Sequence, residues 1–195
     1  MTWIDGLGLD ASYESIRVPA GDAAAALEDF SRDGFRGLNV TLPHKQAVLD
    51  AVSEASPGVQ KIGAANTLSR LSDGSWRADN TDAPGSMAAL ARVGEGVVEG
   101  RRIVLLGAGG AARAALFALD RAGANVLLLN RTVEKAGKII AECCEHPHGY
   151  GPINEVETLS DEADLIINTT SAGHRGDFIQ LPAGNGRLFY DMSYG

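Results

Sequence analysis

The sequence predicts an α/β protein with two lobes, the second of them a doubly wound parallel sheet. Glycine is common, with 24 residues, while aromatic residues make up only 6%. This composition suits tight strand-to-helix turns and aliphatic cores. In the second half, apolar strand patterns alternate with helix patterns, which implies right-handed β-α-β units. A glycine-rich turn also follows a strand pattern over residues 101–106 that ends in an unbroken apolar run, Ile103-Val104-Leu105-Leu106, as expected for a buried parallel strand.

Residues 1–83 are expected to form the first lobe, with the boundary near residues 82–85. Proline at position 43 suits the first turn of a helix, and Ser72-Asp73-Gly74 suits a hairpin turn. The predicted elements are the end of a helix near Gly6 or Gly8, a strand over 13–18, a helix over 22–30, a strand over 35–41, a helix over 43–52, and a hairpin of 66–71 with 76–78.

Residues 84–195 are expected to form the second lobe, reached through a helix that follows Asp82 and runs to about Val93. Residues 94–100 read as a linker, and residues 146–152 as a polar, turn-rich connection. The remaining predicted elements are strands over 101–106, 124–129, 164–168 and 188–192, and helices over 109–121, 133–144 and 154–160.

The charge and the cysteine content narrow the class of function. The formal net charge is −8, which argues against nucleic acid or an anionic membrane as a partner. No apolar run approaches the roughly 20 residues of a membrane span, and the N-terminus lacks a signal-peptide pattern. The two cysteines, Cys143 and Cys144, are adjacent, so a reduced, cytoplasmic protein is expected. We expect a small-molecule substrate and a monomer or homodimer.

The turn Gly107-Ala108-Gly109-Gly110-Ala111-Ala112 predicts a dinucleotide site. Gly107 allows the tight turn, Gly109 lets the backbone approach a pyrophosphate, and Ala112 permits close packing of helix on strand. The start of the helix then offers N–H groups to the phosphates. An ordinary glycine turn is the alternative, but the strand before it and the helix after it favour the dinucleotide site.

The end of the next strand selects the cofactor. An enzyme that uses NAD usually has Asp or Glu there, whereas this sequence has Asn130-Arg131-Thr132. Arg131 can pair with a 2′-phosphate bidentately, which favours NADP; the alternative is a solvated surface arginine. In the loop after the strand over 164–168, Thr169 and Ser171 could contact the nicotinamide end, or their hydroxyls could simply cap a turn.

Lys45 and Asp82 are the candidate chemical groups of the first lobe. Lys45 is expected in the first turn of its helix, where the dipole disfavours a cation by about 0.3–1 kcal/mol. The same dipole favours the neutral amine that an acid–base lysine needs. Asp82 could hold and orient the ammonium, or it could be the N-cap of the following helix. Taken alone, Lys45 favours the interpretation as a solvated surface lysine.

Together these segments resemble the shikimate dehydrogenase family. The motifs GLNVTLPHK, AANTL, DNTD, GAGGAAR, NRT, INTTSAG and YDMSY occur in the family's order and at compatible spacing across essentially the whole chain. The resemblance implies an N-terminal α/β substrate domain plus a Rossmann-type NADP-binding domain. It also implies reversible, NADPH-dependent reduction of 3-dehydroshikimate to shikimate, a step of aromatic amino-acid biosynthesis.

The resemblance also implies roles for individual residues. Lys45 matches the family's catalytic lysine, and Asp82 matches its carboxylate partner. Thr41 and Asn66 match substrate-binding residues, as does Tyr194 from the cofactor lobe. Met192 matches a residue near the nicotinamide.

The sequence departs from the family at both ends. It contains no match to the family's N-terminal strand with its His-Ser-x-Ser-Pro segment, or to its C-terminal helices, so we expect weak or absent shikimate turnover with NADP binding better preserved. A quinate/shikimate dehydrogenase and a non-catalytic NADP-binding relative are the alternatives. His44 is interpreted as a surface residue at a helix start, and His146, His148 and His174 show no metal-ligand spacing, so no metal is predicted.

Overall fold

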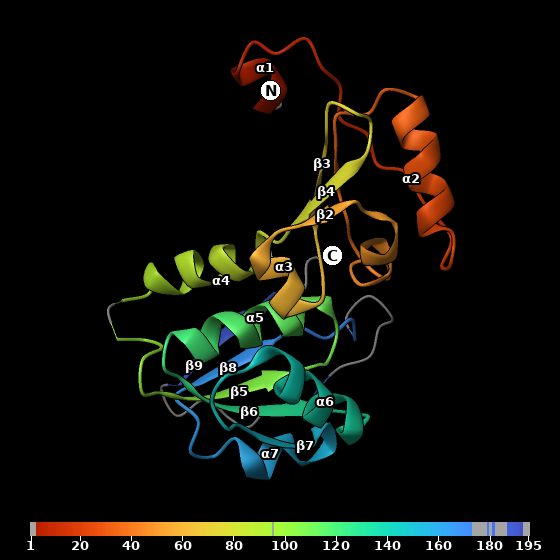
Figure 1. Ribbon diagram of the computed structural model, residues 1–195. Helices are drawn as coiled ribbons and strands as arrows, with labels where there is room; N and C mark the ends of the chain where they lie inside the picture. The colour runs from red at the N-terminus through yellow and green to blue at the C-terminus, as the bar shows by residue number, and fades with distance from the viewer. Residues whose placement is uncertain (1–2, 95, 173–178, 180, 182–186, 193–195) are drawn as a thin grey trace.

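Two β-sheets, one mixed and one parallel, organise the chain (Figure 1). The computed structural model describes residues 3–94, 96–172, 179, 181 and 187–192. A short helix, α1 (Trp3–Gly6), comes first, and the two sheets then follow each other along the chain. Among the described residues, no helix combines the length and apolar character needed to cross a membrane.

The first sheet has the order β1-β3-β4-β2. Strands β1 (Gly37–Asn39), β3 (Thr67–Arg70) and β4 (Trp76–Asp79) are antiparallel, and β2 (Glu54–Ala55) runs parallel to β4. Helix α2 (Ala23–Arg32) packs against this sheet through buried Leu27, whose carbonyl accepts a hydrogen bond from Nε1 of buried Trp76 at 3.0 Å. The predicted hairpin is therefore confirmed.

The second sheet is parallel throughout, with the order β7-β6-β5-β8-β9. Its strands are β5 (Arg102–Leu106), β6 (Asn125–Asn130), β7 (Gly149–Pro152), β8 (Leu165–Asn168) and β9 (Leu188–Asp191). Counted within this sheet, the order is 3-2-1-4-5, which is that of a doubly wound nucleotide-binding sheet. The order reverses direction between β5 and β8, and ligands bind such sheets at the carboxyl ends of the strands beside this point.

Alternation along β5 assigns each side chain to one of two cores. Ile103 and Leu105 pack with α5 (Gly110–Arg121) and α6 (Val133–Cys143), whereas Val104 and Leu106 face the 3₁₀ turn η2 (Ile153–Glu155) and α7 (Val156–Leu159). All four side chains are almost fully buried. The unbroken apolar run therefore reflects a strand covered on both faces, as predicted.

The two halves meet through helices. Figure 1 shows α3 (Pro57–Ile62) and α4 (Asp82–Ala91) between the first sheet and α5. Ile62, Ala64, Ala83 and Ala114 form a small buried cluster at this junction. Alanine side chains allow the backbones of α3, α4 and α5 to approach closely at this junction.

Three differences from the sequence-based predictions concern whether a strand or a helix forms at all. Residues 13–18 form no strand: Tyr13 is 74% and Ile16 45% exposed, and no described strand pairs with this segment. The second difference is that β2 and α3 were not predicted, although Ser56 caps α3 and Gly63 ends it at φ 67°. In the third, β7 lies within the segment interpreted as a polar connection, because strand pairing with β6 outweighs its low strand propensity.

The predicted helix over residues 43–52 is also shorter and begins later. The Leu42–Pro43 peptide bond is cis, and the His44 N–H donates to the Thr41 carbonyl in a turn. A 3₁₀ helix, η1 (Ala47–Ala51), follows this turn. Pro43 therefore belongs to the turn and does not open a helix.

Candidate functional site

Lys45 and Asp82 form a part-buried ion pair at the centre of the site. Lys45 Nζ lies 2.7 Å from Asp82 Oδ2, and the two side chains are 11% and 21% exposed. This burial rules out the interpretation of Lys45 as a solvated surface lysine. Its expected position in the first turn of a helix is wrong, however, because it lies in the turn before η1. The argument from the dipole of its own helix therefore does not apply.

Asp82 begins α4, but its carboxylate does not cap that helix. The N-cap position is Thr81, and the Ala83 N–H instead bonds to Asn80 Oδ1 at 3.2 Å. Asp82 directs Oδ2 to Lys45 and Oδ1 to the side-chain amide of Asn66, at 2.8 Å. A carboxylate in the first turn of a helix is electrostatically favourable. The carboxylate-partner interpretation thus agrees with the geometry, and the N-cap alternative does not.

Backbone contacts hold Asn66 beside the ion pair. The Ala65 N–H donates to the Lys45 carbonyl at 2.7 Å, and the Val40 N–H donates to the Asn66 carbonyl at 2.8 Å. The second contact also brings Thr41, the exposed residue after Val40, to the same edge of the sheet. The structure therefore gathers Thr41, Lys45, Asn66 and Asp82, while the fifth predicted residue of this group, Tyr194, lies outside the described residues.

The glycine turn is built as a dinucleotide site requires. Gly107 has φ 107°, and a Cβ there would lie 2.8 Å from Thr169 Oγ1, so only glycine fits this turn. Gly109 precedes α5, and a Cβ on it would meet no protein atom within 4 Å. The space beside Gly109 is thus open to a ligand at the N-terminus of a twelve-residue helix. Ala112 is fully buried, as its predicted helix-on-strand contact requires.

The residues after β6 lie at the same edge of the sheet. Asn130 Nδ2 donates to the Thr132 carbonyl at 2.8 Å, which closes the turn around Arg131. Arg131 and Thr132 are exposed, so the guanidinium is available to a ligand at this edge.

The loop after β8 shows a structural use for one predicted hydroxyl. Thr169 Oγ1 donates to the Leu106 carbonyl at 2.6 Å, which ties this loop to the glycine turn. Ser171 is part-buried in the same loop. Met192 follows β9, donates its N–H to the Asn168 carbonyl at 2.9 Å, and packs part-buried on the core.

One contact joins the ion pair to the glycine turn. A Cβ on Gly110 would lie 2.9 Å from Lys45 Cβ and 3.1 Å from Lys45 Cδ. The lysine side chain therefore packs directly on the first turn of α5, where the pyrophosphate of a dinucleotide would bind. Residues from two halves of the sequence form one site.

A groove of about 420 Å³ lies next to this site, between the segment 12–18, α2 and β1. Thr41 and His44 line one part of it, but Lys45 and Asp82 do not. The groove and the ion pair are adjacent, and we place the site at the ion pair because the hydrogen-bonding groups converge there. His44 is part-buried, and its Nε2 donates to the Val18 carbonyl at 3.0 Å. The prediction that His44 lies at the start of a helix is therefore wrong.

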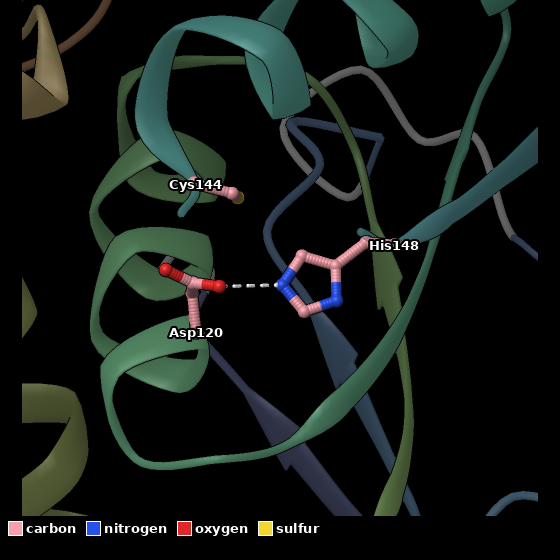
Figure 2. Close-up of side chains that lie close together, drawn as sticks. All are labelled: Asp120, Cys144 and His148. Carbon is pink, nitrogen blue, oxygen red and sulfur yellow. Dashed lines mark hydrogen bonds and ion pairs between the residues drawn. The ribbon is translucent and has the colours of Figure 1, made fainter. Parts of the chain in front are cut away.

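A second cluster of polar side chains lies at the other end of α5, about 15 Å along the helix from Gly110. The spacing of these residues in the sequence did not predict that they would meet. Figure 2 shows Asp120, Cys144 and His148 together, with potential ligand atoms within 4.8 Å of one another. His146 Nδ1 and His148 Nε2 each lie 3.0 Å from Asp120 Oδ1. His174 lies outside the described residues.

Sequence reasoning also missed the role of Arg113. Its side chain is only 8% exposed and crosses from α5 to α3, where Nε donates to the Ile62 carbonyl. Ser56, Pro57 and Gly63 mark the beginning and the end of a helix in the sequence. Recognition of α3 from these residues could have revealed the partner of Arg113.

Comparisons with known proteins match both halves of the chain. Residues 1–68 match the family model for the shikimate dehydrogenase substrate binding domain, and residues 89–176 match that for shikimate / quinate 5-dehydrogenase. The chain is 39% identical over 193 residues to the NADP(+) shikimate dehydrogenase of Hyphomonas neptunium. The aligned region covers 99% of this chain and 70% of that protein.

Two crystal structures of similar proteins agree with these matches. Shikimate dehydrogenase from Aquifex aeolicus superposes with a TM-score of 0.87 at 30% identity, covering 98% of this chain and 71% of that one. Shikimate 5-dehydrogenase from Thermus thermophilus, solved with NADP(H) and shikimate, gives a TM-score of 0.72 at 38% identity, covering 86% and 60%. The chain thus spans 60% to 71% of the lengths of these relatives.

Proposed function

The chain belongs to the shikimate dehydrogenase family, and from this premise we propose that it catalyses the reversible, NADP-dependent reduction of 3-dehydroshikimate to shikimate. The observation that carries the proposal is the packing of Lys45 on Gly110. It brings an acid–base side chain beside the turn that receives the cofactor. Hydride and proton must be exchanged at one carbon–oxygen bond, so these two groups have to lie side by side.

The residues divide the chemistry between them. NADP supplies the hydride acceptor in the oxidation direction and, as NADPH, the hydride in reduction. In reduction, Lys45 gives a proton to the oxygen of the ketone, and in oxidation it takes that proton back. Asp82 holds Nζ of Lys45 at 2.7 Å and orients it, while Thr41, Asn66 and Tyr194 bind the substrate.

The cofactor-binding set comes from the carboxyl edge of the second sheet. Arg131 pairs with the 2′-phosphate, which selects NADP over NAD. Met192 and the loop after β8 would contact the nicotinamide end of the cofactor. The full proposed set is Gly107, Ala108, Gly109, Gly110, Ala111, Asn130, Arg131, Thr132, Thr169, Ser171 and Met192.

We propose residues 1–83 as the substrate-binding domain and residues 84–195 as the NADP-binding domain. The two separate sheets support this division, with α4 leading from one to the other. A cytoplasmic monomer or homodimer without nucleic-acid or membrane partners is consistent with the net charge of −8 and with two cysteines that form no disulfide.

No metal is required by this proposal, and the cluster in Figure 2 is arranged for hydrogen bonding. His148 Nε2 donates to Asp120, and its Nδ1 accepts from the Val126 N–H at 3.4 Å, so both ring nitrogens are used. Burial raises the pKa of the Cys144 thiol to about 12, which opposes the thiolate that a metal would need. Turnover should therefore be unchanged after dialysis against EDTA.

The test is NADPH formation, followed by absorbance, with saturating shikimate and NADP. NAD and quinate are run as separate arms, and NADP binding is titrated directly on the same preparation. NADP-linked oxidation of shikimate that exceeds both other arms is the expected result. Retained NADP binding without turnover would overturn the proposed activity while leaving the cofactor site intact.

A further inference from the structure

Arg113 joins two helices that belong to different halves of the chain. It lies on α5, and its guanidinium reaches the last residue of α3, where Nε donates to the Ile62 carbonyl. Its Nη2 also lies 2.8 Å from Glu142 Oε2 on α6. The hydrogen bond from Arg113 is the main reason why the pKa of Glu142 is lowered from its usual value. One buried cation thus satisfies a helix-end carbonyl and a carboxylate.

The backbone after Ile62 fits closely around this guanidinium. A Cβ on Gly63 would clash with Arg113 Nη2, and Gly63 has φ 67°. Cys143 Sγ also donates to the Ile62 carbonyl, at 3.5 Å. The end of α3 is therefore held against both α5 and α6.

The segment 63–66 carries this anchor directly to the ion pair. Ala64 and Ala65 are fully buried, the Ala65 N–H donates to the Lys45 carbonyl, and Asn66 donates to Asp82. Only three residues lie between Ile62, whose carbonyl Arg113 holds, and Asn66, whose amide orients Asp82. The guanidinium of Arg113 bonds to Ile62 and Glu142 and not to Lys45 or Asp82, but the segment that it anchors contacts both members of the pair.

We propose that Arg113 is a positioning residue for the Lys45–Asp82 pair. By fixing the segment 63–66 against α5, it sets the position of the pair relative to the glycine turn. The inference rests on the proposed function and deepens it, because it assigns a task to a residue that touches neither substrate nor cofactor. A displacement of about 1 Å between reacting groups can lower a rate by about 10²-fold, so the anchor should influence kcat.

The variants Arg113→Met, Arg113→Lys and Glu142→Gln test this proposal. Lys138→Met is the matched control, because Lys138 also pairs with Glu142, at 3.7 Å, but is 75% exposed and does not reach α3. Arg113→Met should lower kcat by about tenfold or more while the dissociation constant for NADP changes little. Arg113→Lys should recover part of the loss, and Glu142→Gln, the mildest change, should show a smaller loss in the same direction. Lys138→Met should behave as the parent protein.

A second measurement does not depend on activity. In the Arg113→Met and Glu142→Gln variants, amide hydrogen exchange of Ala65 should accelerate more than that of core amides in β5 and β8. Equal acceleration everywhere, with kcat unchanged, would show that Arg113 only stabilises the fold and would overturn the proposal. A parent protein without turnover but with the selective change at Ala65 would instead count against the proposed function alone.

Discussion

Lys45 is held both through its backbone and through its ammonium group, and each contact comes from a different segment. Its carbonyl accepts from Ala65, and its Nζ pairs with Asp82. Such a side chain has little rotational freedom left, which suits a group that must deliver a proton along one direction. The residue is therefore positioned before any substrate binds.

Lys45→Met should lower kcat by about 10² to 10⁴-fold, the range that general acid–base catalysis contributes. Methionine keeps most of the side-chain volume beside Gly110, so NADP affinity should change little. Lys61→Met, which alters an exposed lysine in the last turn of α3, serves as the control. Steady-state kinetics with shikimate checks this, and a kcat for Lys45→Met within a factor of a few of the parent would contradict the acid–base role.

Arg131 is the residue that we propose selects NADP over NAD. Removal of a bidentate guanidinium–phosphate pair costs about 1.5–3 kcal/mol. Arg131→Ala should therefore raise KM for NADP by about 10 to 100-fold and leave KM for NAD nearly unchanged. Arg92→Ala, at an exposed arginine after α4, controls for general charge. An equal rise for both cofactors would mean that Arg131 does not read the 2′-phosphate.

At the scale of the element, two neighbouring glycines at the start of α5 have different tasks: one leaves room for the cofactor, and the other leaves room for Lys45. Gly109 faces open space, whereas Gly110 faces Lys45. Gly109→Ala should weaken NADP binding by about tenfold or more because the methyl group fills the place of the pyrophosphate, without loss of stability. Gly110→Ala should mainly lower kcat, because its Cβ would displace Lys45. Titration of NADP together with kinetics separates the two, and identical profiles would contradict this division.

At the scale of the whole molecule, the sequence predicted the parallel sheet better than the first sheet. The elements β5, α5, β6 and α6 follow local rules: an apolar run, a glycine turn and a strongly amphipathic helix. By contrast, β2 has two residues and β7 has the sequence Gly-Tyr-Gly-Pro. Such strands exist only through pairing with distant partners, so no local pattern reveals them.

The candidate site shows the same division between local and distant causes. The glycine turn and Arg131 could be placed from the sequence because both follow predicted strands. The Lys45–Asp82 contact spans 37 residues, and nothing local to either residue specifies it. The error about the helix at Lys45 arose from Pro43, whose sequence signal fits a helix start and a turn equally well.

Asp120 links the stability of the whole fold to pH. Burial alone would raise the pKa of Asp120, but hydrogen bonds from Glu145, His146 and His148 outweigh it and hold the pKa below its usual value. A carboxyl whose pKa is lower in the folded state binds fewer protons there than in the unfolded chain. Its stabilising contribution is present above the unfolded pKa, near 3.9, and is lost as the pH falls through the folded pKa.

The urea midpoint of unfolding should therefore fall steeply below about pH 4. Asp120→Asn should lower the midpoint at pH 7, because its amide group faces the N–H donors of Glu145 and of the two histidines, and should flatten the dependence between pH 5 and pH 2. Asp161→Asn, at an exposed position, should keep the parent curve. Parallel curves for the parent and Asp120→Asn would show that acid unfolding is controlled elsewhere. The hydrogen-bonded cluster at the end of α5 would then hold the α6–β7 connection in place without linking its stability to pH.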